Sequence, residues 1–314
     1  MSPDALIKLA SRFAVTDGRR FRLDQVGTDD TKAFSATKDE ADDLLRKAVA
    51  RIAARQETLY AQNQWGVLLI FQAMDAAGKD SAIEHVFSGV NPQGMQVFSF
   101  KAPSSEELDH DFLWRTTVRL PERGRIGVFN RSYYEEVLVV RVHPELLHSE
   151  GLPERVVTKR IWDERFDDIK AFERHLVRNG YTIRKFFLHV SRAEQARRFL
   201  GRLDEPDKRW KFSTGDLRER DRWDDYMHAY EEAIRSTSTK DAPWIVVPAD
   251  RKWFARLVIA GAVLGALEDL DLESPKISAA QEQELEQVRQ ALLEEVSAPG
   301  ARRKSRKKAG DGRR

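Results

Sequence analysis

The sequence predicts an α/β protein in which helices cover both faces of a central parallel sheet. Five apolar runs, rich in β-branched and aromatic residues, have the length of strands. Most of these runs are near-continuous rather than alternating, as expected for strands that are buried on both faces. Amphipathic stretches separate them, and strand–helix alternation at this spacing is typical of a parallel sheet. The expected strands are Trp65–Met74, Met95–Phe100, Ile126–Asn130, Ile183–Val190 and Trp244–Pro248.

Helices are expected where apolar residues recur at helical spacing between these strands. The stretches are Lys38–Gln62, Lys79–Ser88, Ser104–Val118, Pro153–Arg178, Ala193–Leu203, Ser213–Ser236 and Arg251–Leu270. We expect a main domain over 37–272, with a helical insertion at about 191–236 between the fourth and fifth strands. The other expected parts are an N-terminal arm or hairpin outside the core over 1–36, a C-terminal helix over 273–298 and a disordered basic tail over 299–314.

The composition excludes several classes of protein. The chain has 314 residues, of which 41% are hydrophobic and 33% charged, and it contains no cysteine. Disulfides, thiolate catalysis and cysteine-ligated metals are therefore excluded. The N-terminus lacks the pattern of a signal peptide, and the longest uncharged apolar run, Leu257–Leu267, is far shorter than the roughly 20 residues that span a membrane. We expect no membrane insertion and a cytoplasmic location.

The net charge of +2 is unevenly distributed. Residues Ala301–Arg314 hold eight basic side chains and one acidic side chain, Asp311, so this tail carries +7 and the rest of the chain −5. The tail could be a solvated segment without a specific role. Alternatively, it could tether a polyanion loosely, with binding that weakens steeply as salt rises.

The stretch Gly66–Ser81 has the order of a phosphate-binding loop: a buried strand, a turn of small residues, and Gly-Lys at the start of a helix. It departs from the usual G-x-x-x-x-G-K-[ST] pattern, because Ala73 replaces the first glycine and Asp80 the final Ser or Thr. Asp75 lies inside the loop, where it would repel phosphate unless a metal lies between them, so we interpret it as a Mg²⁺ anchor. The alternative is an ordinary strand–turn–helix in which Lys79 is solvated.

The third expected strand ends in a polar cluster, at the place where P-loop enzymes carry a metal-binding carboxylate. The strand-end residue is Asn130, which brings no charge, and Arg131 follows with a planar fork that suits phosphate oxygens. Glu135 or Glu136 would then supply any acidic role; the alternative is a surface turn with a mixed charge. Arg141 lies in an apolar run and should face either a carboxylate or a bound phosphate, because a buried unpaired guanidinium is costly.

Two further segments carry predictions. In the helical insertion, a Pro-containing turn leads to Lys208, Arg209 and Lys211 around a tryptophan, which favours a lid that closes cations over a transferring phosphate. Acidic neighbours balance much of this charge, so a solvated helix pair is the alternative. The loop with Gly89 and Asn91 follows the helix of the phosphate-binding loop and could contact a nucleotide or be a plain connector.

Taken together, these motifs resemble the polyphosphate kinase 2 family over roughly Phe21 to Leu272. The resembling segments are Gln72–Asp80, Gly89–Pro92, Phe129–Glu135, Val137–Val142, Lys185–His189, Lys208–Phe212 and Ala242–Trp244. The resemblance implies a three-layer, thymidylate-kinase-like P-loop fold with a helical lid. It also implies phosphoryl transfer between inorganic polyphosphate and nucleotides that depends on Mg²⁺, which Mn²⁺ could replace. The family often forms dimers or tetramers, so the resemblance implies a homo-oligomer.

The resemblance also implies roles for individual residues. Asp75 would organise the metal, and Lys79 would bind the transferring phosphate with the backbone of Ala76, Ala77 and Gly78. Arg131 would hold phosphate, and Glu135 would assist the metal or the acceptor. The other expected phosphate-binding residues are Asp80, Asn130, Arg141, Lys208, Arg209 and Lys211, and Gly89 and Asn91 are expected to bind the nucleotide.

Asn130 departs from family members that carry Asp, and it resembles the subgroup that accepts both nucleoside mono- and diphosphates. The expected substrates are therefore inorganic polyphosphate and the purine nucleotides AMP and ADP, with GMP and GDP as further candidates. No specific nucleic-acid partner is expected. The alternatives are an ATP-dependent nucleotide kinase and a non-catalytic P-loop protein that binds polyanions.

Overall fold

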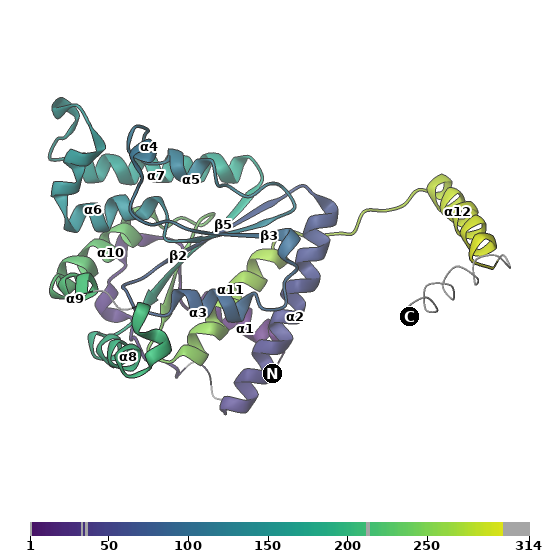
Figure 1. Cartoon of the computed structure of the whole chain (residues 1–314), viewed down its shortest axis with the longest axis horizontal. Coiled ribbons are helices and arrows are strands. Elements are labelled where there is room, and N and C mark those ends of the chain that lie inside the picture. Colours follow the sequence, from purple (N-terminus) through teal and green to yellow (C-terminus); the bar gives the residue numbers. More distant parts are fainter. Residues whose placement is uncertain (1, 33, 35–36, 212–213, 298–314) are drawn as a thin grey trace, which may run out of the picture. The chain divides into compact units, whose positions relative to one another are not determined.

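A six-stranded sheet forms the centre of the first of two units, Met1–Glu273, in the computed structural model (Figure 1). The structure describes residues 2–32, 34, 37–211 and 214–297, without the side chains of Lys38, Lys208, Lys211 and Thr214. The strand order is β1-β6-β5-β2-β4-β3, and every pair is parallel except β1–β6. The strands are β1 (Ala14–Val15), β2 (Gly66–Gln72), β3 (Met95–Ser99), β4 (Ile126–Asn130), β5 (Tyr181–His189) and β6 (Trp244–Pro248). All five predicted strands are present, and the predicted α/β class is confirmed.

The register places the carboxyl ends of the central strands at one edge of the sheet. In the parallel ladders, Val67 of β2 pairs with Ile126 of β4 on one side and with Thr182 of β5 on the other. Every residue of β2 and β6 is buried, as the continuous apolar runs predicted. The edge strand β3 differs, because only one neighbouring strand covers it and its Val97 is about half exposed.

Helices cover both faces of the sheet. α1 (Pro3–Ser11), α2 (Lys38–Gln62), α3 (Lys79–Val86) and α11 (Lys252–Glu268) pack together on one face, and α7 (Ile161–Arg178) and α10 (Trp223–Thr237) lie on the other (Figure 1). The shorter helices are α4 (Ser105–Leu108), α5 (Trp114–Thr117), α6 (Val139–Val142), α8 (Arg192–Asp204) and α9 (Thr214–Asp221). Short 3-10 helices cover Gly18–Arg20, Leu23–Gln25, Pro92–Gly94, Tyr133–Val137, Pro144–Glu150, Glu154–Val156 and Pro206–Lys211. The expected helix Ser104–Val118 is therefore divided into α4 and α5.

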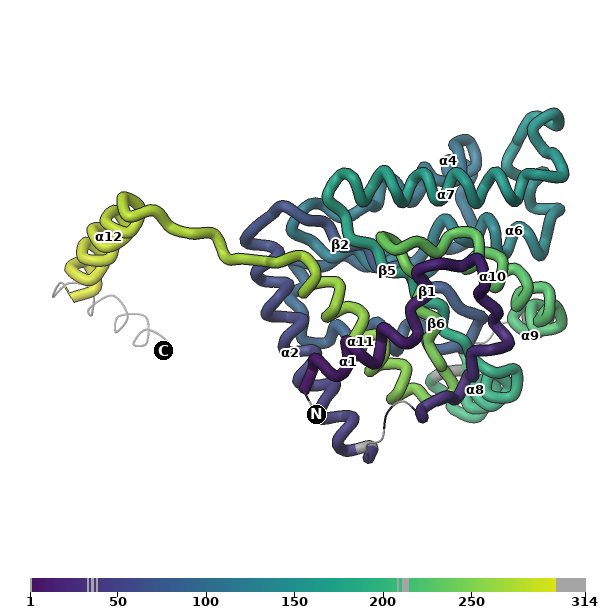
Figure 2. The backbone as a smooth tube through the Cα atoms, turned by 180° about the vertical axis from the view of Figure 1, so that it is seen from behind, coloured from purple at the N-terminus to yellow at the C-terminus, as the bar shows by residue number. Residues whose placement is uncertain are grey.

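The expectation that the N-terminal segment lies outside the core is wrong. α1 buries Leu6 completely and packs against α11, and the two-residue β1 adds to the sheet beside β6 (Figure 2). The contact is close at Gly261 of α11, where a Cβ atom would lie 2.1 Å from the carbonyl oxygen of Leu6. A strand of two residues is too short to show alternation, so the sequence pattern did not reveal it.

A charged pair lies inside this unit, between β5 and α7. The side chain of Lys185 is fully buried, and its Nζ donates to Glu173 Oε2 at 2.5 Å, to the Tyr134 hydroxyl at 3.1 Å and to the Thr237 carbonyl at 2.8 Å. Glu173 Oε1 accepts hydrogen bonds from the hydroxyls of Tyr133 and Tyr134. Burial lowers the pKa of Lys185, which the carboxylate of Glu173 opposes. The pair joins the middle of the sheet to helices on one of its faces.

The second unit, Ser274–Arg314, contains one described helix, α12 (Ala279–Ser297), which lies within the expected 273–298. Its apolar residues are exposed, among them Leu285, Val288 and Leu292. The expected basic tail, 299–314, lies outside the described residues. Across the described part of the chain, no helix is both long and apolar enough to cross a membrane.

Candidate active site

The loop 73–78 connects the buried strand β2 to α3 at the carboxyl edge of the sheet. A turn is closed by the Ala77 N–H, which donates to the Met74 carbonyl at 3.2 Å. Ala76 and Gly78 both have left-handed backbone conformations, with φ of +60° and +101°. Glycine adopts this conformation freely, whereas Ala76 is strained by about 1 kcal/mol or more. α3 then begins at Lys79, so its unpaired N–H groups open onto this loop.

The ammonium of Lys79 is held at the loop rather than solvated. Its Nζ donates to the Ala73 carbonyl at 2.9 Å, and the side chain is buried. Burial lowers the pKa of Lys79, and the neighbouring charge of Arg131 lowers it further, while three carboxylates near it raise it. This lysine is therefore close to the polar cluster at the end of β4, as the sequence predicted for a phosphate site.

Arg131 forms the centre of that cluster. Its N–H donates to the Phe71 carbonyl of β2, which fixes it beside the 73–78 loop in a left-handed conformation with φ of +66°. The guanidinium donates to two carboxylates: NH2 lies 2.8 Å from Asp75 Oδ1, and NH1 lies 3.3 Å from Glu135 Oε2. These charges, Glu135 above all, raise the pKa of Arg131. The structure thus brings Asp75, Lys79, Arg131 and Glu135 together.

Two amide side chains hold the carboxylates of this site. The fully buried Gln72, the last residue of β2, donates through Nε2 to Glu135 Oε1 at 2.7 Å. Asn130, the last residue of β4, donates through Nδ2 to Asp80 Oδ1 at 2.6 Å. Asn130 thereby links the end of β4 to the first turn of α3 without adding charge. Gln72 carried no predicted role, although its place just before the loop is visible in the sequence.

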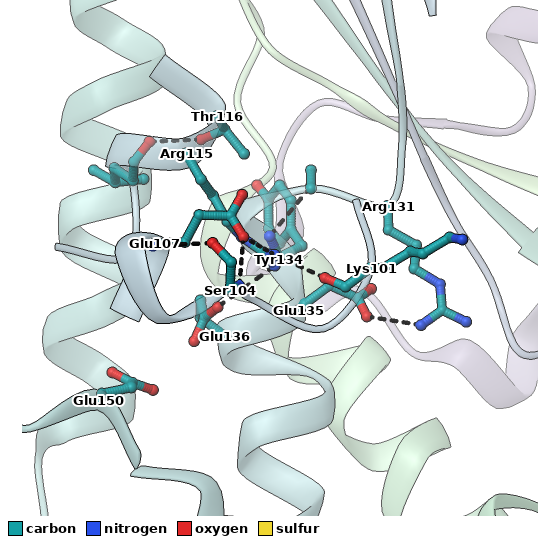
Figure 3. A network of polar contacts seen from close by, with 12 residues as sticks. Lys101, Ser104, Glu107, Arg115, Thr116, Arg131, Tyr134, Glu135, Glu136 and Glu150 are labelled. Atoms are coloured by element: carbon teal, nitrogen blue, oxygen red, sulfur yellow. Dashed lines mark hydrogen bonds and ion pairs between the residues drawn. The ribbon is translucent and has the colours of Figure 1, made fainter. Parts of the chain in front are cut away.

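A pocket of about 350 Å³ opens beside Arg131 and Glu135 (Figure 3). Its wall combines apolar and charged side chains from the segments that follow β3 and β4. Its residues are Lys101, Ala102, Pro103, Glu107, Leu108, His110, Phe112, Arg115, Arg131, Glu135, Glu136, Val139, Val140, Leu146, Ser149 and Glu150. Burial, together with the nearby carboxylate of Glu150, raises the pKa of Glu136 to about 7.

Sequence reasoning missed most of this pocket. The only available signal was the position of Lys101 just after β3, because side chains at the carboxyl ends of parallel strands gather at one edge. Phe112 and Arg115 lie just before and within α5, Glu150 ends a 3-10 helix after β4, and no local pattern connects these two segments.

Gly89 and Asn91 do not reach this site, which corrects their expected role in nucleotide binding. They lie between α3 and β3, and β3 begins level with the first residues of β4, so this loop is at the amino edge of the sheet. The 73–78 loop lies at the opposite edge. Asn91 instead accepts a hydrogen bond from the backbone N–H of Gln93 and starts a 3-10 turn.

Arg141 is another correction to the expected phosphate contacts. It forms an ion pair with Glu232 of α10, and its guanidinium lies over the rings of Trp162 and Phe166. Of the two alternatives drawn from the sequence, a carboxylate or a phosphate, the structure has the carboxylate.

The helical insertion between β5 and β6 consists of α8, α9 and α10 (Figure 2). Arg209 is exposed, and its Nε donates to the Leu203 carbonyl at 2.7 Å, within the insertion itself. The side chains of Lys208 and Lys211 lie outside the described residues. The role of these three cations as a lid over phosphate stays a prediction.

The carboxylates at the loop fit a metal ion that arrives with phosphates. In the described part of the chain, no three His, Asp or Glu side chains converge on a common metal position. Mg²⁺ does not need such a cage, since it commonly binds one or two carboxylates and completes its shell with water and substrate phosphates. Asp75, which is partly exposed on the loop, and Asp80 on the first turn of α3 offer the oxygen ligands that this mode requires.

Comparison with known proteins gives one consistent family. The profile of "Polyphosphate kinase 2 (PPK2)" matches residues 35–275. The chain is 54% identical over 283 residues to the ADP-polyphosphate phosphotransferase of Rhodopseudomonas palustris, covering 90% of this chain and 98% of that protein. It is 44% identical over 271 residues to the AMP/ADP-polyphosphate phosphotransferase of Meiothermus ruber, covering 86% and 97%.

Solved structures agree with this similarity. The crystal structure of polyphosphate kinase 2 from Arthrobacter aurescens TC1 superimposes with a TM-score of 0.80 at 41% identity, covering 91% of this chain and 96% of that one. Both the sequence and the fold therefore relate the 73–78 loop and its surroundings to the same family.

Proposed function

The chain belongs to the polyphosphate kinase 2 family, and on that premise we propose that it transfers phosphoryl groups between inorganic polyphosphate and both AMP and ADP, with Mg²⁺ as its metal. The observation that carries this proposal is the guanidinium of Arg131, which is forked between Asp75 and Glu135 beside both the 73–78 loop and the pocket. Phosphoryl transfer needs positioning and positive charge more than covalent help, and this arrangement supplies both.

The 73–78 loop would hold the phosphoryl group that is transferred. Backbone N–H groups at the start of α3 bind its oxygens, and Lys79 exchanges its contact with the Ala73 carbonyl for a contact with phosphate. Arg131 adds positive charge where negative charge spreads in the transition state. An oxygen of the acceptor's terminal phosphate forms a bond to phosphorus while the bond from phosphorus to the bridging oxygen breaks, and polyphosphate leaves shorter by one unit.

No side chain has to remove a proton from the acceptor. The attacking oxygen belongs to a phosphate group that is already ionised at neutral pH, unlike the hydroxyl group of an alcohol or a serine. This agrees with a site that contains cations and hydrogen-bonded carboxylates. Asp75 and Asp80 would hold a bound Mg²⁺, which neutralises part of the phosphate charge.

The pocket beside Arg131 is the proposed acceptor site. Its volume of about 350 Å³ lies within the usual range for small-molecule sites, and it joins apolar residues such as Phe112 and Leu146 to the cations Lys101 and Arg131. The apolar part suits a base and the cations suit phosphates, so one site can take nucleotides with one or two phosphates.

The test supplies the purified protein with long-chain polyphosphate, Mg²⁺ and either AMP or ADP, and follows ADP and ATP formation. We expect both products from the wild-type protein, and Lys79→Ala should lower turnover by about 100-fold or more because the transferred phosphoryl group loses the ammonium at the start of α3. Lys47→Ala is the matched control, since this lysine is exposed on α2 and pairs with Asp43. Nucleotide phosphorylation only when ATP is supplied as the donor would overturn the proposal.

A further inference from the structure

Two side chains of α8 bind the carbonyl groups of the 73–78 loop. Arg198 donates through NH1 to the Ala77 carbonyl at 2.5 Å and to the Ala76 carbonyl at 3.3 Å. Gln195 donates through Nε2 to the Asp75 carbonyl at 2.9 Å. Three consecutive carbonyls of the loop are thus held by one helix.

These contacts decide where the loop's N–H groups point. In a planar trans peptide, the C=O of one residue and the N–H of the next point in opposite directions. When the carbonyls of Asp75 and Ala77 face α8, the N–H groups of Ala76 and Gly78 must face away from it. Neither N–H donates to another protein group within the described residues, whereas the N–H of Ala77 closes the turn to Met74.

The loop needs such external support because its backbone is strained. Ala76 has φ of +60°, which an L-residue keeps only when its surroundings enforce it. The guanidinium of Arg198 provides a rigid connection: its NH2 also donates to the Ala249 carbonyl at 2.5 Å and the Asp250 carbonyl at 3.2 Å, just after β6. Its side chain is only 7% exposed, and its Nε bonds to Glu194. The loop is thereby fixed to the segment after β6, a strand that β5 separates from β2 in the sheet.

The same connection extends into the helical insertion. The Gln195 side chain is almost fully buried, and its Oε1 accepts a hydrogen bond from NH1 of Arg220 on α9 at 2.8 Å. Arg220 NH1 also donates to the Arg192 carbonyl at the start of α8. A chain of hydrogen bonds therefore runs from α9 through Gln195 to the backbone of Asp75.

We propose that Gln195 and Arg198 are positioning residues for phosphoryl transfer, which hold the carbonyls of the 73–78 loop outward so that the N–H groups of Ala76 and Gly78 face the bound phosphate. The inference rests on the proposed function for its kinetic part. Neither side chain needs to touch substrate; they act through the direction of the peptide groups. The link through Arg220 makes that direction depend on the placement of α9.

The test uses Arg198→Lys and Gln195→Met in the full-length protein. A lysine keeps the charge but cannot span the carbonyls of Ala77 and Ala249, and methionine keeps the volume of Gln195 without its donor. Arg197→Lys is the matched control, because Arg197 lies on the same helix and bonds to the same Glu194 but is 69% exposed. Calorimetry measures the affinity for inorganic tripolyphosphate, steady-state assays measure kcat and KM, and thermal unfolding measures the folded fraction.

We expect Arg198→Lys to lower kcat by about 100-fold and to weaken tripolyphosphate binding, with the protein still folded at the assay temperature. Gln195→Met should act in the same direction but less, and it replaces Arg198→Lys as the decisive variant if the latter fails to fold. The Arg197→Lys control should match the wild type. Unchanged kcat and tripolyphosphate affinity in the folded variants would overturn the inference. Equal decreases of kcat in Arg198→Lys and in the Arg197→Lys control would overturn it as well.

The binding measurement separates this inference from the proposed function. If the wild-type protein forms no ATP from polyphosphate and ADP, the function fails, but tripolyphosphate affinity still tests whether α8 sets the loop's N–H groups. If the wild-type protein forms ATP and the Arg198→Lys and Gln195→Met variants match its kcat and tripolyphosphate affinity, the inference fails and the proposed function stands.

Discussion

Two clusters of charged side chains, one around Lys185 and Glu173 and one around Arg131 and Asp75, differ in what can reach them. Lys185 and Glu173 have side chains exposed by 0% and 2%, and every contact of the lysine ammonium is with another buried protein group. Arg131 and Asp75 are exposed by 37% and 29%, and Arg131 borders a pocket. The first cluster is closed on all sides, whereas the second can exchange its partners for a substrate.

This difference shows that an ion pair is not by itself a sign of function. A buried pair has already lost its water, so its geometry must satisfy every hydrogen bond, and removing one partner leaves a costly charge. A half-exposed pair keeps access to solvent and contributes little to stability. The open cluster, at the carboxyl ends of β2 and β4, is where a phosphate can replace a carboxylate contact. The predictions below test this contrast.

The largest effect should come from the open cluster. Arg131→Ala should lower turnover with polyphosphate and ADP by about 1000-fold or more, because an arginine at a transferring phosphoryl group is worth that much. The unfolding temperature should change by only a few degrees, measured by thermal denaturation of the same preparation. Arg174→Ala on the exposed side of α7 is the control. A large loss of stability with turnover per folded molecule preserved would reverse the contrast.

The closed cluster should show the opposite pattern. Lys185→Met leaves Glu173 buried without its cation and should lower the free energy of unfolding by about 3 kcal/mol or more, measured by denaturant titration. Turnover per folded molecule should stay near that of the wild type. Lys170→Met is the control, because this lysine pairs with Asp167 on the exposed surface of α7 and should cost less than about 1 kcal/mol. Equal losses for the two lysines would contradict the distinction.

Glu136 is a buried carboxylate in the wall of the pocket, and its contribution to stability should depend on pH. Its pKa of about 7 exceeds the ordinary 4.5, so between these values the folded state binds more protons than the unfolded state. The free energy of unfolding should therefore fall as pH rises from about 4.5 through 7. Glu136→Gln removes this titration, so its stability relative to the wild type should increase between pH 5 and pH 8 by on the order of 1–2 kcal/mol. Parallel pH profiles for the two proteins would argue against this shift.

The smallest effect is expected at Asn130. Asn130→Asp replaces a hydrogen bond to Asp80 with two facing carboxylates, which should cost about 1 kcal/mol of stability through repulsion unless a metal lies between them. Added Mg²⁺ should then stabilise the variant more than the wild type in thermal unfolding. Asn130→Ala separates the loss of the hydrogen bond from the added charge. An equal response of all three proteins to Mg²⁺ would exclude the proposed closeness to a metal.

The sequence predicted the strands and the 73–78 loop because both depend on local patterns. A buried run followed by small residues and Gly-Lys determines the order strand, loop, helix, whatever the rest of the chain does. The position of Arg131 beside this loop also followed from the predicted strands, because Arg131 comes directly after β4 and neighbouring parallel strands end at the same edge of the sheet.

The predictions that failed depend on contacts between distant parts of the chain. Glu232 follows Arg141 by many residues, and only the packing of α10 brings its carboxylate there. Gly89 and Asn91 are near the loop in sequence, but the intervening α3 carries them across to the other edge of the sheet. The contacts of Gln195 and Arg198 could not be predicted either. Both side chains bind backbone carbonyls, which every residue has, so no sequence motif indicates such a contact.

The pairing of β1 with β6 has a consequence for synthesis on the ribosome. Ala14 emerges early, but its partner Ile245 is made more than two hundred residues later. Until then, α1 lacks α11, its main packing partner, and β1 lacks β6, so the N-terminal segment cannot dock completely during most of translation. The first fifteen residues of the chain are thus among the last to complete their packing against the rest of the fold.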